Sequence, residues 1–447
     1  MAGDSDARLD DALSPVNGRV SALPANFRRG PRPARARSPV SGPNHLPLHL
    51  TVMTENTTDT KGISASSRPR VLSGMRPTGR LHLGNYMGAL YNWVQLQHQY
   101  ECYFFIADYH ALTTNYADTS GLKDDIRQVA LDFLAAGLDP AKCTIFVQSQ
   151  VKAHFELNDL LGMITPVSWL ERVPTYKDQQ EQLREKDLAT FGFLGYPLLQ
   201  SADILIYQPS FVPVGQDQAA HVELTREVAR RFNQFYPGDF FLAPEAAPWE
   251  RPAIEEKARK LANDKTKTVF SPHQLFEAAR QAKLKSAFGV TEVLPEPQVL
   301  LTPSPKLPGT DGRKMSKSYH NTILLSDSEP EVRAKLKTMV TDPARIRRED
   351  PGNPDVCPVF DLHKVFSTDA TRQKVREGCT TAGIGCIECK GWLADAVVEE
   401  LAPIQQRRLY FEANLDEVDA ILADGSKRAA ARAAVTMGQV RRAVGLE

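Results

Sequence analysis

The chain has 447 residues, enough for two or three domains at roughly 150 residues each. Hydrophobic residues make up 42% of it and charged residues 24%, which excludes a wholly disordered or fibrous protein. Lysine plus arginine equals aspartate plus glutamate at 54 each, so binding of nucleic acid would need local basic patches. No apolar run reaches the ~20 residues of a membrane span, and six cysteines are too few for a disulfide scaffold. We therefore expect a soluble, cytoplasmic protein with no membrane partner.

Residues 1–67 differ in texture from the rest of the chain. Prolines alternate there with Arg, Ser, Gly and Asn, and almost no apolar periodicity is present. We predict a disordered N-terminal extension, because such a segment buries too little surface to order itself. Four early aspartates argue against a transit peptide. Met53 precedes a polar lead-in and would serve as a translation start, in which case residues 1–52 would not exist in the cell.

From Val71 onward, short apolar runs alternate with amphipathic stretches. We expect strands at 71–75, 102–108, 143–149 and 211–215, and helices at 84–98, 120–137, 195–207 and 216–233. This alternation predicts an α/β fold with a Rossmann-type parallel sheet, which binds ligands at the carboxyl ends of its strands.

The remaining segments suggest the domain organisation. We predict a catalytic domain over 68–330, in which 240–305 is an insertion or connector with one helical piece near 272–287, and 306–330 holds a lysine loop. From 331 to 447 the pattern is helical and ends in Ala- and Arg-rich turns, which predicts a C-terminal all-helical domain.

The segment 73–90 (SGMRPTGRLHLGNYMGAL) places a Gly-rich turn after the first strand and then enters a helix. Backbone N–H groups and the positive end of the helix dipole meet at such an entry and favour phosphate. Gly84 permits close approach of a ring or phosphate, while His82 and Asn85 offer hydrogen-bond donors. Alone, the pattern is equally compatible with a plain strand–helix turn.

The segment 312–322 (GRKMSKSYHNT) carries two lysines, Lys314 and Lys317, beside the hydroxyls of Ser316 and Ser318. Such a run is usually a solvated basic loop. Combined with the first segment it is more informative. In-line displacement at a nucleotide α-phosphate needs a phosphate cradle and cations that neutralise the departing pyrophosphate.

Together these segments resemble the signatures of class I aminoacyl-tRNA synthetases, and most closely those of the bacterial tryptophanyl members. HLGN (82–85) stands where the family has a His-Ile-Gly-His-type motif, and KMSKS (314–318) matches its lysine loop. The resemblance covers roughly 70–235 and 306–446, with further matching stretches at 106–114, 171–178, 196–207 and 212–233. It implies an enzyme that activates L-tryptophan with ATP and Mg2+ and transfers it to the 3′ end of tRNA(Trp).

The resemblance also implies roles for individual residues. The catalytic residues would be Lys314, Lys317, His82 and Asn85. The ATP-binding residues would be Arg76, Pro77, Thr78, His82, Gly84, Asn85, Gly215, Gln216, Asp217, Lys314, Met315, Ser316, Lys317 and Ser318. The tryptophan-binding residues would be Asp203, His110, Gln218, Val212, Val214 and Gln200. Asp203 would accept the indole N–H, and a buried carboxylate left unpaired by Phe or Tyr would discriminate without editing.

Two positions depart from the family pattern: Arg76 replaces a common Gln, and Gln200 replaces an apolar Met. Tyr196, Gln200 and Asp203 also share the spacing of the amino-acid-binding helix of the tyrosyl members. A tyrosine-specific enzyme is therefore the minority alternative, opposed by the tryptophanyl-like block 212–227. A non-catalytic paralogue that binds nucleotide or RNA is the alternative from another class, opposed by the two complete signatures.

Four cysteines form a separate motif. Cys357, Cys379, Cys386 and Cys389 are spaced C-x21-C-x6-C-x2-C, and four thiolates would complete either a zinc site or a [4Fe–4S] cluster. A subset of tryptophanyl members carries such a cluster on cysteines of closely similar spacing, so the resemblance favours iron–sulfur over Zn2+. The remaining two cysteines lie in expected strands and are interpreted as core residues.

Basic residues gather in two places near the C-terminus. They are Lys335, Lys337, Arg345, Arg347 and Arg348 in one group, and Lys427, Arg428, Arg432, Arg441 and Arg442 in the other. Such runs are often only solvated surface, yet on a neutral protein they fit contacts with tRNA phosphates. The resemblance further implies that the helical domain binds the anticodon and that the protein is a homodimer.

Overall fold

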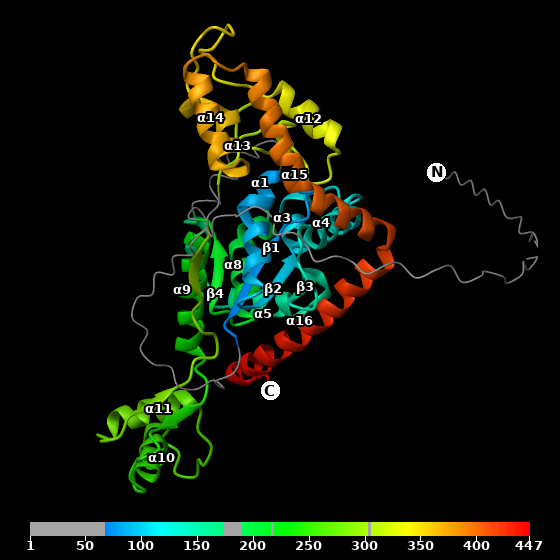
Figure 1. Ribbon diagram of the computed structural model, residues 1–447. Helices are drawn as coiled ribbons and strands as arrows, with labels where there is room; N and C mark the ends of the chain where they lie inside the picture. Colours follow the sequence, from blue (N-terminus) through cyan, green and yellow to red (C-terminus); the bar gives the residue numbers. More distant parts are fainter. Residues whose placement is uncertain (1–67, 174–188, 216–218, 303–304) are drawn as a thin grey trace, which may run out of the picture. The chain divides into compact units, whose positions relative to one another are not determined.

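The computed structural model describes residues 68–173, 189–215, 219–302 and 305–447. The predicted disorder of 1–67 lies outside these residues, as do positions 174–178 of one matching stretch. Figure 1 shows the arrangement of the described elements, with the strands at the centre and helices on both sides of them.

The central sheet has five parallel strands in the order β3-β2-β1-β4-β7. They are β1 (Arg70–Met75), β2 (Glu101–Ile106), β3 (Cys143–Val147), β4 (Phe211–Val214) and β7 (Gln298–Leu301). The first four were predicted from their apolar runs, and the Rossmann-type α/β fold is confirmed. Nearly every residue of β2 and β3 is buried, because helices cover both faces of a parallel sheet.

Helices connect these strands. Those before β7 in the main body are α1 (Leu83–Asn85), the π-turn η1 (Tyr86–Leu90), α2 (Tyr91–Leu96), α3 (Asp108–Asn115), α4 (Leu122–Ala136), η2 (Gln148–Gln150), α5 (Ala153–Gly162), α6 (Val167–Glu171), α8 (Phe191–Leu205) and α9 (Ala219–Phe235). The predicted helix 84–98 is thus one helical run with a π-turn in its middle, and π-turns occur often at functional sites. Helices α3 and α5 were not predicted.

The stretch that the sequence left unassigned contains a small unit with its own core. Strands β5 (Phe240–Leu242) and β6 (Phe288–Val290) pair antiparallel beside α10 (Glu250–Leu261) and α11 (Pro272–Gln281). Apolar side chains from the two helices, such as Ile254 and Leu275, form a cluster separate from the main core. The helical piece expected near 272–287 is α11, which starts at a capping box on Ser271.

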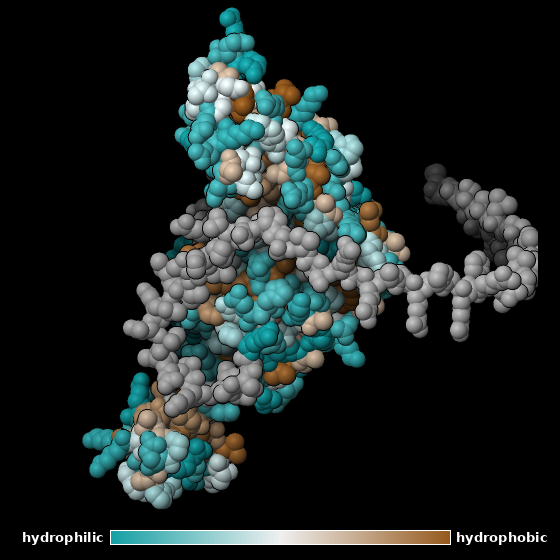
Figure 2. Space-filling model, in the orientation of Figure 1, coloured by the Kyte–Doolittle hydropathy of each residue, from teal (hydrophilic) through white to brown (hydrophobic). Residues whose placement is uncertain are grey.

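The described chain after β7 contains helices and no further strand, as predicted. These helices are α12 (Glu329–Thr338), α13 (Pro358–Phe366), α14 (Asp369–Thr380), α15 (Cys386–Ala413) and α16 (Leu415–Val444), with short 3-10 turns η4 (Lys317–Tyr319) and η5 (Pro354–Val356). Figure 2 shows that hydrophilic and hydrophobic residues are mixed on the visible face of these helices. Searched over the described residues, none of the helices has the length and apolarity that a bilayer crossing requires.

The two longest helices return to the catalytic sheet. Helix α15 packs against α4, and α16 packs along β3 (Figure 1). A methyl group at Gly425 of α16 would overlap the carbonyl oxygen of Ile145 in β3, so the helix lies directly on the strand backbone. The domain boundary at 330 and 331 therefore stays a prediction, since the helices beyond it share packing with the elements before it.

Candidate active site

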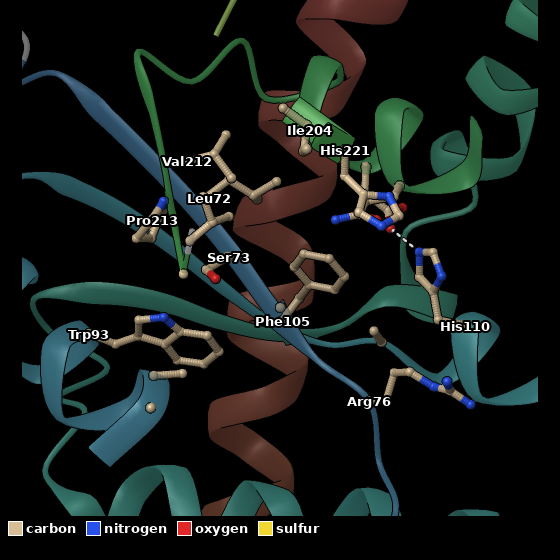
Figure 3. Close-up of a pocket in the computed structure, with 18 of the residues that line it drawn as sticks. Leu72, Ser73, Arg76, Trp93, Phe105, His110, Ile204, Val212, Pro213 and His221 are labelled. Carbon is tan, nitrogen blue, oxygen red and sulfur yellow. Dashed lines mark hydrogen bonds and ion pairs between the residues drawn. The ribbon is translucent and has the colours of Figure 1, made fainter. Parts of the chain in front are cut away.

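A cavity of about 440 Å³ lies at the carboxyl ends of β1 and β4, where the strand order changes direction. Open parallel sheets bind ligands at this switch point, and the volume suits a small molecule. Figure 3 shows Leu72 and Val212 on its apolar side and His110 across from them. Phe105 lies between, where its ring covers Gly74 so closely that no side chain would fit there.

The predicted amino-acid pocket corresponds to this cavity. The structure places five of its six residues in the lining, namely Asp203, His110, Gln200, Val212 and Val214. Tyr196, Gln200 and Asp203 share one face of α8 because their spacing of four and three follows the helical repeat. The sixth residue, Gln218, lies outside the described residues. Their roles in binding tryptophan stay predictions.

Asp203 is the buried charge of the cavity. Its side chain is 1% exposed, and its oxygens accept hydrogen bonds from His110 Nε2 at 2.8 Å and His154 Nδ1 at 2.7 Å. Gln148 Nε2 donates to both oxygens, at 2.7 and 2.8 Å. Burial alone would raise the pKa of Asp203, but the bonds from the two histidines outweigh it and lower that pKa below its usual value. The acid is therefore held as a carboxylate acceptor.

The first signature lies at the start of the helical run that follows β1. His82 caps it, with Nδ1 accepting the Asn85 backbone N–H at 3.3 Å, while Asn85 Oδ1 accepts the His82 backbone N–H at 3.2 Å. Gly84 leaves the entry open, since a side chain there would press against the His82 ring. Reciprocal hydrogen bonds thus order the predicted helix entry, and its binding of phosphate stays a prediction.

The side chain of Asn321, a buried residue that was not among the predicted site residues, forms hydrogen bonds with the lysine loop. Its side chain accepts from Ser316 N at 2.8 Å and donates to Asp311 Oδ1 at 2.7 Å and to the Lys314 carbonyl at 3.2 Å. Met315 is buried beneath the loop, whereas Lys314 is exposed. The loop backbone is therefore fixed, with the Lys314 side chain exposed and the Lys317 side chain half-buried.

The two signatures meet in space although 232 residues separate His82 from Lys314. Lys317 Nζ donates to the Thr78 carbonyl oxygen at 2.6 Å, and Leu83 N donates to the Ile323 carbonyl at 2.9 Å. Burial, followed by the charges of Lys317 and Lys314, lowers the pKa of His82 to about 4. Burial also lowers the pKa of Lys317, although Asp125 opposes this. Both lysines therefore lie within electrostatic range of the phosphate cradle.

Only some of the other predicted ATP-binding residues line the cavity. Arg76 and Gly215 line the cavity, and the Arg76 guanidinium donates to the Thr114 hydroxyl. Pro77 is buried in the turn after β1, and Ser318 lies exposed in η4. Gln216 and Asp217, and with them the predicted ribose contact, lie outside the described residues.

The family model described as tRNA synthetases class I (W and Y) matches residues 64–248 and 259–402 of the chain. The chain belongs to this family. The match spans both signatures, so the cavity and the lysine loop lie within the region that the family shares.

Individual relatives of this class I tRNA synthetase agree with that assignment. The chain is 49% identical over 396 residues to a tryptophan–tRNA ligase of Ralstonia nicotianae, and the match covers 84% of this chain and 98% of the relative. A tryptophan–tRNA ligase of Thermotoga maritima is 47% identical over 379 residues, covering 84% and 99%. The structure of tryptophanyl-tRNA synthetase from Campylobacter jejuni, complexed with ADP and tryptophan, has a TM-score of 0.66 at 28% identity and covers 84% of this chain and 100% of its own.

The four cysteines of the synthetase converge from three elements. Cys357 precedes α13, Cys379 lies in the last turn of α14, and Cys386 and Cys389 form the first turn of α15. Burial, followed by the other three thiols, raises the pKa of Cys389 to about 12. Within the described residues, however, no group of three or more His, Cys, Asp or Glu side chains is placed to hold a metal ion. The thiols are neighbours, but their present arrangement does not form a coordination site.

Three arginines of the expected basic face on the last helix are bonded within the protein. Arg428 donates to the Thr144 hydroxyl and the Pro140 carbonyl, Arg432 donates to Gln208, and Arg441 pairs with Glu156. These guanidinium groups join α16 to β3, to α5 and to the turn after α8, although Arg428 and Arg441 stay partly exposed and Lys427 and Arg442 are exposed. Their contact with tRNA stays a prediction. Arg345 is buried, donating to the carbonyls of Arg348 and Ile384.

Proposed function

We propose that this class I synthetase joins L-tryptophan to tRNA(Trp), with ATP as the second substrate. The observation that carries the proposal is the convergence of His82, Lys314 and Lys317 after β1, the strand that also lines the cavity holding the carboxylate of Asp203. The relatives named as tryptophan–tRNA ligases support the choice of amino acid. Asp203 would accept the indole N–H, and Val212 and Val214 would contact the ring.

The first step is adenylate formation. A carboxylate oxygen of tryptophan attacks the α-phosphorus of ATP, the bond to the bridging oxygen of the β-phosphate breaks, and pyrophosphate leaves. Lys314 and Lys317 stabilise the charge that develops on the departing pyrophosphate, and the helix entry at His82 and Asn85 holds the phosphates. No side chain acts as a nucleophile, so positioning and electrostatics provide the catalysis.

The second step transfers the aminoacyl group. A hydroxyl of the 3′-terminal ribose of tRNA attacks the carbonyl carbon of the adenylate, and AMP leaves with the bonding electrons. We propose that Mg2+ accompanies ATP and supplies further positive charge to its phosphates when bound. We also propose that the C-terminal helices bind the anticodon, that the enzyme is a homodimer and that it is cytoplasmic.

One assay tests the central proposal. Pyrophosphate exchange into ATP should depend on L-tryptophan and should be at least about 10³-fold weaker with L-tyrosine, because the pocket would bind the indole N–H and its ring specifically. Exchange that prefers tyrosine would favour the tyrosyl alternative. An absence of exchange with either amino acid, in a folded protein that still binds ATP, would favour a non-catalytic paralogue.

We propose further that Cys357, Cys379, Cys386 and Cys389 bind a [4Fe–4S] cluster, with Zn2+ as the alternative ligand. Their convergence and the donor chemistry of four thiolates support the proposal, and closure on a metal would require the thiols to move closer together. Iron, sulfide and zinc should be measured in protein purified without oxygen. A sample with neither metal would contradict the proposal.

A further inference from the structure

Asp203 is supported by a layer of residues that the substrate would not touch. Gln148, at the carboxyl end of β3, and His154, in α5, are both 0% exposed. The described lining of the cavity includes Asp203 and His110 but neither of these two residues. Both nevertheless donate to the Asp203 carboxylate, at distances of 2.7 to 2.8 Å.

The orientation of each donor is fixed by a further contact. Gln148 Oε1 accepts the Tyr109 backbone N–H at 3.1 Å, which turns the amide nitrogen toward Asp203. His154 Nε2 lies 2.8 Å from the Tyr207 hydroxyl. Burial raises the pKa of Tyr207 well above its usual value, so the phenol stays protonated and its O–H donates a hydrogen bond to Nε2. The His154 proton must then sit on Nδ1, where it points at Asp203 Oδ1.

The two oxygens of Asp203 are consequently different. Oδ1 accepts from His154 and Gln148, and neither of these residues lines the cavity. Oδ2 receives a branch of the Gln148 amide and the ring of His110, which itself lines the cavity. Figure 3 marks this bond from His110 with a dashed line. Because its partner His110 lines the cavity, Oδ2 is the oxygen on the cavity side, where a substrate N–H would approach the carboxylate.

We infer that Gln148 and His154 are positioning residues for specificity, which hold the Asp203 carboxylate rotated so that Oδ2 accepts the indole N–H of tryptophan. The inference rests on the proposed function. Neither residue was among the predicted site residues: Gln148 fell at the end of an expected strand, and His154 lies in a helix that was not predicted. Their effect would pass entirely through one hydrogen bond to the substrate.

That dependence provides the test. In 3-benzothienyl-L-alanine a sulfur atom replaces the indole N–H, so the analogue keeps the shape of tryptophan without the donor. His154→Leu and Gln148→Met should each lower kcat/KM for tryptophan in pyrophosphate exchange by about 10- to 100-fold, the value of a hydrogen bond to a charged group. For the analogue, kcat/KM should change less than about threefold. KM for ATP should not change in either variant.

His154→Asn is the matched control, because the amide nitrogen of Asn occupies the place of Nδ1 and still donates to Asp203. It should recover tryptophan activity to within about fivefold of the wild type. An equal loss for tryptophan and the analogue would mean a merely structural role and would overturn the inference, as would no loss for either. If His154→Leu does not fold, Gln148→Met carries the same comparison. A wild-type enzyme inactive with tryptophan would instead contradict the proposed function itself.

Discussion

Lys317 lies close enough to His82 for its charge to lower the His82 pKa, and we propose that this charge stabilises the departing pyrophosphate. Changing Lys317 to Ala should reduce the rate of adenylate formation by about 10²- to 10³-fold, because a preorganised charge acts mainly in the transition state. Tryptophan affinity should barely change, since the Asp203 pocket is built from other elements. Single-turnover adenylate formation and tryptophan binding by fluorescence would check both. A large loss of affinity at an intact rate would contradict the assigned role.

His82 gives the site a dependence on pH. Its pKa of about 4 lies below the value of about 6.5 for an unfolded histidine, so the folded protein favours the neutral ring. As the pH falls below about 6.5, His82 becomes protonated in the unfolded chain but stays neutral in the folded chain until about pH 4. The free energy of unfolding should therefore fall by up to about 3 kcal/mol between about pH 6.5 and pH 4. His82→Asn keeps an acceptor for the Asn85 N–H and removes the titration. Urea unfolding at pH 7 and pH 4.5 should therefore show a smaller acid-induced loss in the variant; equal losses would contradict this origin.

Gly425 in α16 and Gly391 in α15 provide a test of how closely the two C-terminal helices pack. Gly425→Ala should destabilise the protein by about 2 to 4 kcal/mol, because the added methyl group overlaps the Ile145 carbonyl and pushes α16 away from β3. Gly391 in α15 has open space around it, so Gly391→Ala should stabilise the protein by about 0.5 to 1 kcal/mol through helix propensity. Thermal unfolding of the two variants should shift in opposite directions.

A buried ion pair joins α15 to the segment before the first signature. Arg408 pairs with Asp132 of α4, and the other oxygen of Asp132 accepts the Leu81 backbone N–H at 2.6 Å. Arg408→Met should cost about 3 to 5 kcal/mol, because it leaves a buried carboxylate without its partner. The exposed Arg333, which pairs with Glu329 and Asp395, is the control, and Arg333→Met should cost less than about 1 kcal/mol. Denaturant unfolding of both variants would separate the two cases.

Most of the catalytic fold was predictable, because continuous apolar runs such as 102–108 identify strands that are buried on both faces. The edge strand β7 escaped prediction: it has four residues, and Gln298 and Leu301 at its ends are exposed. Helix α3 escaped for a different reason, since its polar residues face the site and weaken the apolar stripe by which helices are recognised.

Site residues were predictable only where they belong to a short motif whose spacing along the chain identifies it. The signatures at 82–85 and 314–318 are local, so their residue types and order sufficed. The partners of Asp203 are not local: Gln148 and His154 come from other elements, and only the folded chain brings their donors to one carboxylate. The bond of Arg428 to Thr144 of β3 was not predictable for the same reason, because the sequence gives its charge and not the face on which it lies.

On the scale of the whole molecule, the bonds that Arg428, Arg432 and Arg441 make within the protein leave the loop after α12 as the better candidate for binding tRNA phosphates. Arg347 and Arg348 remain exposed, in the loop between α12 and α13. Replacing both with Ala should raise KM for tRNA, because two contacts with phosphates would be lost. The steepness of log affinity against log salt should also fall by between about 1 and 2, because tRNA binding would then release fewer counterions. Pyrophosphate exchange, which needs no tRNA, should be unchanged. Arg428→Ala is the control: it should lower the unfolding temperature and leave the salt slope as it is, because its guanidinium is bonded to the β3 side of the sheet. An unchanged slope in the double variant would mean that tRNA is bound by another surface.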